Sequence, residues 1–316
     1  MTIHGPTAFG PVKIIPGKHK SRFPFSNSIF IDDDVKAIVD TGAGSEALEA
    51  LKKSSHIDLV INSHYHFDHI AYNYLFDDAK ILLNDIEAEC YRDRHRIGIL
   101  LGMTEVYGDA WVDDWLTRIS NPATEQSPYS PQNNHKWWLS TARIDAEYKW
   151  GDIFDFGKTR MHVIGAPGHS EGFCCMYFPD LGIVYVADID LTVFGPWYGG
   201  TDGNIDLFID SCRKIEQLDA KYFVTGHEFG VVTRDDFRAG LAAFLDSINQ
   251  RDSLLLAQLT RPMTLAALSD LGIIYGKKFH VDAWVYMWNY LMTKKHLERL
   301  ITRGRVVQTD EGYVAV

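Results

Sequence analysis

The sequence predicts an α/β layered fold with a small helical appendage at its C-terminal end. Two observations carry this prediction: short apolar segments of strand length alternate with helical patterns, and the composition shifts after residue 260. Of the 316 residues, 46% are hydrophobic and 23% charged, which are the values of a globular protein and exclude a wholly disordered or collagen-like chain. We therefore expect a main domain over residues 1–260 and an extension over residues 261–316.

Strand-like and helical segments alternate on both sides of a central interruption. In the first 85 residues, the predicted strands are 26–32, 35–40, 58–62 and 80–84, and a helix is predicted to begin at Glu46. After residue 160, the predicted strands are 160–166, 173–178, 182–187 and 221–225, and the predicted helices are 205–218 and 234–258. Such alternation is typical of layered α/β folds.

Residues 85–150 interrupt this alternation with an aromatic-rich insert. Large side chains recur at every fourth position, at Met103, Tyr107, Trp111 and Trp115, which predicts one face of a helix. Residues 121–136 are rich in Pro, Asn and Ser and are predicted to form a long loop. Two interpretations stay open: the aromatic stripe is ordinary core packing, or the insert is a lid over a site.

The extension is predicted to contain helices at 264–270 and 281–301, followed by a hairpin that turns at 310–312. Helices followed by a terminal hairpin resemble a small winged-helix appendage. Trp284, Trp288 and Leu291 fall on one face of the second helix, and a stripe of this kind requires cover. We therefore expect the extension to dock against the main domain or against a second copy of the chain, which makes a homo-oligomer possible.

The charge and cysteine content narrow the class of protein. Lys and Arg number 31 against 42 Asp and Glu, so the net charge is −11 and long-range attraction to nucleic acid is disfavoured. No apolar run approaches the roughly 18 residues of a membrane span, and the N-terminal segment lacks a signal-peptide pattern. The four cysteines show no metal-binding spacing. We expect a cytoplasmic protein with reduced thiols that acts on a small molecule and binds neither membrane nor nucleic acid.

Metal-binding residue types gather directly after the predicted strand 58–62. Three histidines and one aspartate fall within six residues, at His64, His66, Asp68 and His69. Ligands bind at the carboxyl ends of strands in α/β sheets, and imidazole and carboxylate are donors for first-row metals. Other predicted strands are followed by similar residues, at Asp40, His169, Asp188 and His227. Together these donors suffice for a site with two metals.

This ordered set resembles the metallo-β-lactamase superfamily over roughly residues 25–230. The resemblance implies an αββα sandwich of two mixed sheets with helices outside. It assigns one metal to His64, His66 and His169, a second metal to Asp68, His69 and His227, a bridging role to Asp188, and to Asp40 the role of orienting a ligand from behind. The extension is similar to the winged-helix segment of the branch that contains thioesterase-like and ribonuclease-like members.

The implied chemistry is metal-dependent hydrolysis. Two divalent cations are expected, with zinc as the leading candidate and iron or manganese as alternatives. Asp68 and Asp188 offset only part of their charge, so a bridging water should ionise near neutral pH and attack the substrate as hydroxide. The expected substrate is a thioester, or a lactone or other ester, of small to medium size and partly apolar. Tyr198 is a candidate hydrogen-bond donor to its carbonyl oxygen.

Three other chemistries compete with this one. Gly168–Gly172 matches the G-x-S-x-G nucleophile elbow with Ser170, but a strand is predicted where the elbow needs a helix. A phosphodiesterase or ribonuclease would use the basic residues of the extension, which instead cluster at a helix end, where cations are favourable anyway. An iron-dependent redox enzyme with a flavin domain finds no room in this chain, although single-iron chemistry stays open.

Overall fold

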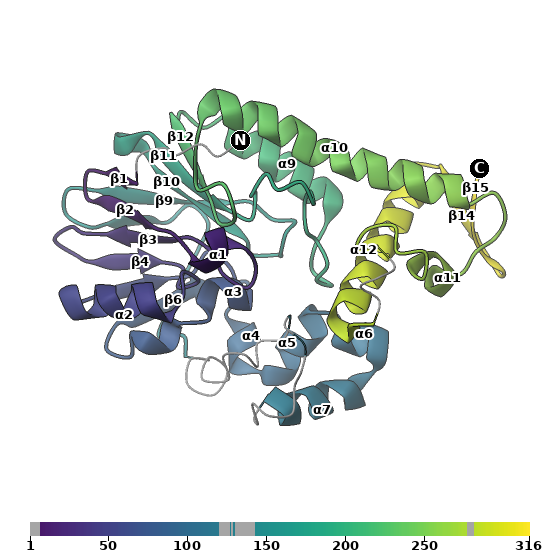
Figure 1. The fold of residues 1–316 in the computed structure, drawn as a ribbon, viewed down its shortest axis with the longest axis horizontal. Coiled ribbons are helices and arrows are strands. Elements are labelled where there is room, and N and C mark those ends of the chain that lie inside the picture. Colours follow the sequence, from purple (N-terminus) through teal and green to yellow (C-terminus); the bar gives the residue numbers. More distant parts are fainter. Residues whose placement is uncertain (1–6, 120–126, 128, 130–142, 277–280) are drawn as a thin grey trace.

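The computed structural model describes residues 7–119, 127, 129, 143–276 and 281–316. Two β-sheets pack face to face with helices on their outer sides, so the predicted αββα sandwich is confirmed (Figure 1). The predicted loop 121–136 lies outside the described residues except for Ser127 and Tyr129, as do Trp137 and Trp138.

The first sheet has seven strands that lie side by side in sequence order. These are β1 (Ala8–Phe9), β2 (Val12–Ile15), β3 (Ser28–Ile31), β4 (Ala37–Val39), β5 (Leu59–Ile61), β6 (Lys80–Asn84) and β7 (Ala146–Tyr148). β4, β5, β6 and β7 run parallel to one another, and the other neighbours are antiparallel. A short turn, α1 (Lys18–Ser21), joins β2 to β3. Parallel strands place their carboxyl ends at one edge of the sheet.

The second sheet has six strands in the order β13-β12-β11-β10-β9-β8. Their bounds are β8 (Ile153–Asp155), β9 (Arg160–Gly165), β10 (Cys174–Phe178), β11 (Ile183–Ala187), β12 (Tyr222–Thr225) and β13 (Val231–Thr233), with a 3-10 turn, η3 (Pro179–Leu181), after β10. Only β11 and β12 run parallel among these neighbours. This sheet therefore also offers one pair of adjacent carboxyl ends.

Alternating side chains join the layers. Ala37 and Val39 of β4 lie in the core between the sheets, whereas Ile38 packs outward with Leu48 of α2 (Ser45–Ser54). The outer side of the second sheet is covered by α9 (Ile205–Glu216) and α10 (Arg234–Gln258), the helices at the top of Figure 1. Because both faces of β4 are buried, its sequence is apolar at every position.

The insert between β6 and β7 is helical. It contains α4 (Glu89–Arg92), α5 (Arg94–Leu100), α6 (Met103–Tyr107) and α7 (Asp109–Ile119), and it follows α3 (Phe67–Ile70) and η1 (Asn73–Leu75) in the chain. The expectation of one helix through Met103 and Trp115 is wrong, because the chain turns at Gly108, whose φ is 85°. Both side chains are nevertheless buried in one cluster, since short helices folded against each other can share a core.

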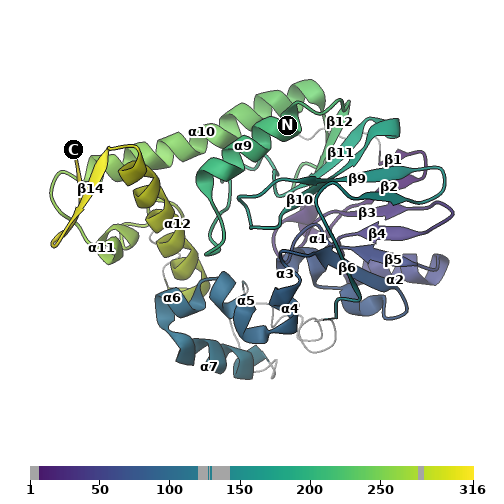
Figure 2. The same ribbon diagram turned by 180° about the vertical axis from the view of Figure 1, so that it is seen from behind.

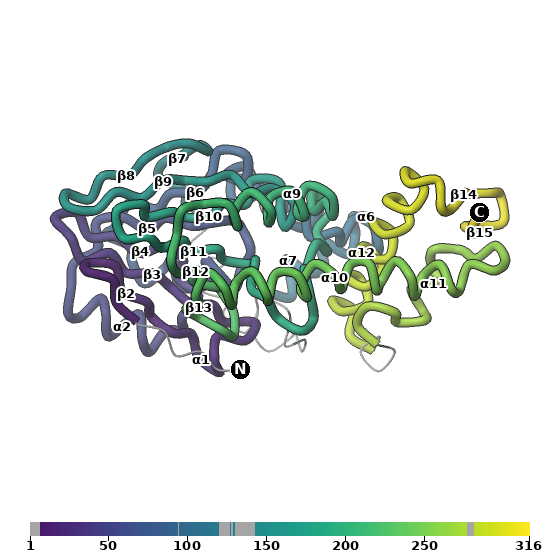
Figure 3. Tube along the Cα trace, turned by 90° about the horizontal axis from the view of Figure 1, so that it is seen from above, coloured from purple at the N-terminus to yellow at the C-terminus, as the bar shows by residue number. Residues whose placement is uncertain are grey.

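The appendage contains α11 (Leu265–Ser269), α12 (Ala283–Thr302) and a hairpin of β14 (Val306–Thr309) and β15 (Gly312–Ala315). Figure 3 shows it beyond the end of α10 that lies farthest from the strands. α12 crosses back to α6 and α7 (Figure 2), where Trp284 packs 5.8 Å from the ring of Trp115. The apolar stripe of α12 is thus covered within the same chain. Among the described residues, no helix combines the length and hydropathy needed to cross a bilayer.

Candidate metal centre

Strands of both sheets end at the same place between the layers. Asp40 follows β4 and Ser63 and His64 follow the neighbouring parallel strand β5, while Asp188 follows β11 and His227 follows its parallel neighbour β12. Each parallel pair ends at one edge of its sheet, and the two edges face each other across the sandwich. Ligands bind at the carboxyl ends of parallel strands, and here each of the two sheets contributes such ends to the same place.

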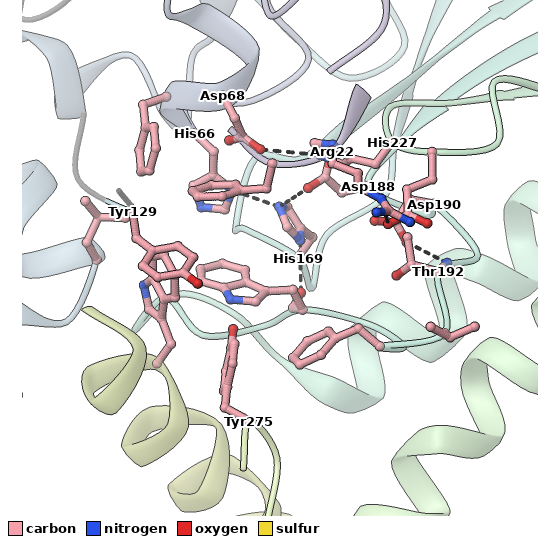
Figure 4. A pocket seen from close by; sticks show the side chains of 18 residues that line it. Arg22, His66, Asp68, Tyr129, His169, Asp188, Asp190, Thr192, His227 and Tyr275 are labelled. Atoms are coloured by element: carbon pink, nitrogen blue, oxygen red, sulfur yellow. Dashed lines mark hydrogen bonds and ion pairs between the residues drawn. The ribbon is translucent and has the colours of Figure 1, made fainter. Parts of the chain in front are cut away.

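The structure brings together all seven residues predicted as metal ligands. They form two groups, His64, His66, His169 and Asp188, and Asp68, His69, Asp188 and His227. Within each group the potential ligand atoms lie within 4.8 Å of one another, and Asp188 belongs to both. Figure 4 shows five of these side chains converging above the pocket. The shared carboxylate has the position that a bridging ligand requires.

Three of the histidines are held by their Nδ1 atoms. His69 Nδ1 lies 2.7 Å from Asp40 Oδ2, His169 Nδ1 lies 2.9 Å from the carbonyl oxygen of Trp197, and His227 Nδ1 lies 2.9 Å from that of Ser21. An Nδ1–H group donated to such an oxygen leaves Nε2 as the nitrogen that faces the centre and is available to a metal. These Nε2 atoms point inward, at 2.7 Å and 3.1 Å from Asp188 oxygens for His69 and His169, and at 3.3 Å from Asp68 Oδ2 for His227. The rings are therefore set for metal coordination.

Asp40 lies behind the predicted ligands, as the orienting role expected of it requires. It is fully buried, and its carboxylate accepts bonds from Ser63 N and Oγ at 2.7 Å and from the Tyr185 hydroxyl at 2.8 Å. With the contact to His69, one carboxylate fixes the ring of a predicted ligand and the chain that precedes His64.

The electrostatics of the centre favour bound cations. Burial raises the free energy of an imidazolium and lowers the pKa of His66 to about 3. Burial also opposes charge on His69, but Asp188 and Asp40 outweigh it and raise the pKa of this ring to about 10. Despite burial, nearby histidines keep the pKa of Asp188 well below its usual range. The carboxylate of Asp188 thus stays ionised and attracts positive charge, while within the described chain the buried Nε2 atoms of His64 and His66 have no hydrogen-bond partner. This donor set fits divalent metal ions.

A pocket with a cavity volume of about 290 Å3 opens from the centre. Its floor includes His66, Asp68, His169, Asp188 and His227, and its walls are mainly apolar: Phe23, Phe67, Leu101, Tyr129, Phe194, Trp197, Tyr275 and Trp288. Tyr275, which is labelled in Figure 4, and Trp288 both come from the appendage, so the extension contributes to the pocket walls. An apolar cavity with polar groups at one end is the usual form of a small-molecule site.

Two residues that the sequence suggested for catalysis do not line the pocket. Tyr198 is fully buried behind the pocket, and its hydroxyl is bonded to Arg251 and His296, so the expectation that it meets a substrate carbonyl is corrected. Its neighbour Trp197 faces the pocket instead. Ser170 donates to the buried carboxyl of Glu87 and is followed by strand β10, so the helix that a nucleophile elbow needs is not there.

Several residues of the site were not anticipated from the sequence. Glu87 holds the His169 loop by accepting from Ser170 Oγ and from Gly172 N. Asp40 was identified as a polar residue at the end of an apolar strand. The same signal exists for Glu87, which lies shortly after β6. Phe23 and Tyr275 carry no comparable signal, since each is an aromatic residue in a loop and reaches the pocket only through the tertiary fold.

Comparison with known proteins places this fold and centre in a family. A family model described as the metallo-beta-lactamase superfamily matches residues 22–89 and 129–227. A metallo-beta-lactamase family protein of Thermus thermophilus superposes with a TM-score of 0.70 at 20% identity, over 97% of this chain and 99% of that one. A beta-lactamase domain protein of Burkholderia ambifaria gives a TM-score of 0.65 at 17% identity, over 97% and 91%. Both likenesses show the fold and include the appendage.

Curated relatives match shorter stretches. The acyl-coenzyme A thioesterase MBLAC2 of Bos taurus is 22% identical over 166 residues, which are 48% of this chain and 53% of the relative. A hydroxyacylglutathione hydrolase of Hyphomonas neptunium is 31% identical over 88 residues, 27% and 33% of the two chains. The chain thus spans about half or less of the length of these relatives. The family model covers more than half of the chain and contains all the predicted ligands, so the protein belongs to the metallo-β-lactamase superfamily.

Proposed function

We propose that this protein is a dinuclear metal-dependent hydrolase of a carboxylic thioester, or of a lactone or other ester, whose acyl part is small to medium in size and partly apolar. One observation carries the proposal: two donor groups that share Asp188 lie at the floor of an apolar cavity. The two curated relatives carry names of thioester hydrolases, which supports the thioester over the other esters.

Two divalent cations suit the donor sets. His64, His66 and His169 would hold one, Asp68, His69 and His227 the other, with Asp188 between them. Bound there, such cations would supply Lewis acidity toward a carbonyl oxygen and lower the pKa of a water. Zinc is our leading candidate, with iron or manganese as alternatives, because histidine and carboxylate suit all three.

The chain supplies binding and exclusion of water. Trp197, Tyr275 and Trp288 form apolar walls that would bind an acyl group beside the donor cluster. At the rim, Arg22 Nε lies 3.2 Å from Glu228 Oε1, so the positive charge there is largely offset. A rim of low net charge suits a neutral or weakly charged small molecule better than a polyanion.

The test combines metal analysis with a substrate panel of a thioester, a lactone, a β-lactam and a phosphodiester. We expect two metals per chain and fastest turnover of the thioester or the lactone, lost on chelation and restored by Zn2+, Fe2+ or Mn2+. Asp188→Asn should lower activity by more than the roughly 100-fold that loss of an orienting partner costs. The matched control is Asp180→Asn, which changes an exposed carboxylate and should be silent.

Three results would contradict the proposal. One metal per chain, with the Asp68, His69 and His227 group empty, would exclude the dinuclear centre. Preferential cleavage of the phosphodiester would favour the ribonuclease-like alternative, and oxidation of a thiol compound by an iron-loaded protein would favour redox chemistry.

A further inference from the structure

A buried arginine of α10 holds the loop of residues 192–199, which is part of the connection from β11 to α9. Arg251 is 6% exposed, and it donates to the carbonyl oxygen of Pro196 at 2.8 Å and to that of Phe194. Its guanidinium also lies over the Phe194 ring, 4.7 Å from the centroid. Gly195 brings the loop so close that a Cβ there would lie 2.0 Å from Ser247 Oγ. The loop is therefore fixed against α10.

Behind Arg251, a directed chain of hydrogen bonds runs to α12. Arg251 donates to Tyr198 Oη at 2.9 Å, and this oxygen lies 2.6 Å from His296 Nε2. His296 Nδ1 lies 2.6 Å from Asp252 Oδ1, and Arg299 donates to the other oxygen of Asp252. A neutral His296 with its proton on Nδ1 satisfies every donor and acceptor in this chain. Burial lowers the pKa of His296 and keeps the ring neutral.

The other side of the same loop contacts the metal centre. The carbonyl oxygen of Trp197 accepts from His169 Nδ1 at 2.9 Å, which directs Nε2 of that ring toward Asp188. The Trp197 ring packs edge-on against His66, with centroids 5.0 Å apart. Arg251 bonds to Pro196 and Tyr198, the residues directly before and after Trp197, and so fixes the carbonyl that orients His169.

We propose that Arg251 is a positioning residue for the metal centre. Through the 192–199 loop it holds the Trp197 carbonyl, and through that carbonyl it sets the orientation of His169. The chain Tyr198–His296–Asp252 extends this support to α12, so the appendage takes part in metal binding as well as in framing the pocket. The inference rests on His169 being a ligand, as in the proposed function, and holds whichever bond is cleaved.

The decisive variant is Arg251→Met, which keeps much of the side-chain volume and removes the donors. The matched control is Arg238→Met, on the same helix but half-exposed and paired at the surface with Glu216. Zinc affinity is measured by chelator competition well below the unfolding temperature. We expect Arg251→Met to bind zinc about 10-fold or more weakly, the range seen when partners of ligands are lost, and Arg238→Met to match the wild type.

The absorption spectrum of the Co2+-loaded protein reports ligand geometry separately from stability. We expect its bands to shift in Arg251→Met and to return toward the wild-type position in Arg251→Lys, which keeps a donor for the loop carbonyls. Tyr198→Phe removes only the hydroxyl between Arg251 and His296 and should lower zinc affinity several-fold. If Arg251→Met does not accumulate as folded protein, the zinc affinity of Tyr198→Phe tests the inference in its place.

Wild-type zinc affinity and an unchanged Co2+ spectrum in Arg251→Met and Tyr198→Phe would overturn the inference, even if both variants unfold at lower temperature, since that would show a role in stability alone. A wild-type protein that takes up no metal would contradict the proposed function as well. A wild type that binds metal but cleaves none of the tested acyl bonds would contradict only the proposed function.

Discussion

At the scale of single residues, Asp40 combines an unfavourable backbone conformation with a fully bonded carboxylate at the candidate metal centre. It has a φ of 56°, in the left-handed region that costs a residue with a Cβ about 1 kcal/mol or more. Its carboxylate receives four contacts in return, from Ser63 N, Ser63 Oγ, His69 and Tyr185. The local conformation is unfavourable, and the hydrogen bonds that it permits offset the cost.

The first residue-scale prediction concerns this carboxylate. Asp40→Asn keeps the shape and tolerates the backbone conformation, but it removes the negative charge that holds the Nδ1–H of His69. We expect zinc affinity to fall about 10- to 100-fold with the fold intact. The measurement is chelator competition, with Asp34→Asn, at an exposed carboxylate, as the control. Equal affinities in the two variants would show that Asp40 does not orient a ligand.

The second concerns Glu87, whose pKa burial raises to about 8 from an ordinary value of 4.5. Between these values the unfolded chain has lost the proton that the folded chain still holds, so rising pH favours unfolding. Glu87→Gln has no such proton. The difference in free energy of unfolding between Glu87→Gln and the wild type should therefore shift in favour of the variant by about 1 kcal/mol per pH unit between about pH 5 and 8. Above that range the difference should stay constant. Parallel stability curves from urea unfolding of the two metal-free proteins would contradict this.

The site residues at strand ends were predictable because a polar residue that directly follows an apolar strand in sequence also lies at the end of that strand in the fold. Asp188 and His227 each follow an apolar segment, and that order survives folding. The role of Tyr198 was not predictable, because in an irregular loop adjacent residues such as Trp197 and Tyr198 can face opposite ways. The Tyr198 side chain is directed away from the pocket by its hydrogen bond to Arg251, which is 53 residues away in sequence.

At the scale of elements, the interface between α7 and α12 joins the insert to the appendage. Trp115 and Trp284 are both buried there, with ring centroids 5.8 Å apart. The sequence revealed an apolar stripe on each helix but not that the stripes meet. Strands such as β1 and β13 escaped prediction because they are too short to form a pattern and exist only through pairing with a neighbour.

Two variants separate the structural and the binding part of this interface. Trp284→Ala removes a ring with 1% exposure that does not line the pocket, and should lower the free energy of unfolding by about 3–5 kcal/mol while KM stays near the wild-type value. Trp288→Ala should also destabilise the protein and in addition raise KM, because its ring forms a pocket wall. Denaturant unfolding and steady-state kinetics test both. A raised KM in both variants alike would show that the interface moves as a unit.

At the scale of the whole molecule, four basic residues of the appendage are engaged inside the chain. Lys294 pairs with Glu105 at 2.7 Å, and Arg299 and Arg303 pair with Asp206 at 3.0 Å and 3.1 Å. Lys295 donates to the carbonyl oxygens of Thr201 and Gly203, and burial lowers its pKa. These contacts, with the net charge of −11, support the proposal that the extension does not serve a polyanion.

The corresponding prediction uses Lys294→Ala. An exposed ion pair contributes at most about 1 kcal/mol, so stability and turnover of a small ester should be nearly unchanged. A fluorescence titration with RNA or DNA should show no salt-sensitive binding in the micromolar range for the wild type. Binding that the variant abolishes would instead make the appendage a nucleic-acid module.

Two walls of the pocket come from a stretch of chain that carries none of the predicted ligands. All the predicted ligands lie between His64 and His227, whereas Tyr275 and Trp288 are contributed after α10 has carried the chain away from the sheets. Mutations in the appendage can therefore resize the cavity without altering a single donor atom. Related proteins with this arrangement can differ in substrate while they keep the same donor residues. Directed evolution of acyl preference should therefore begin at Tyr275 and Trp288.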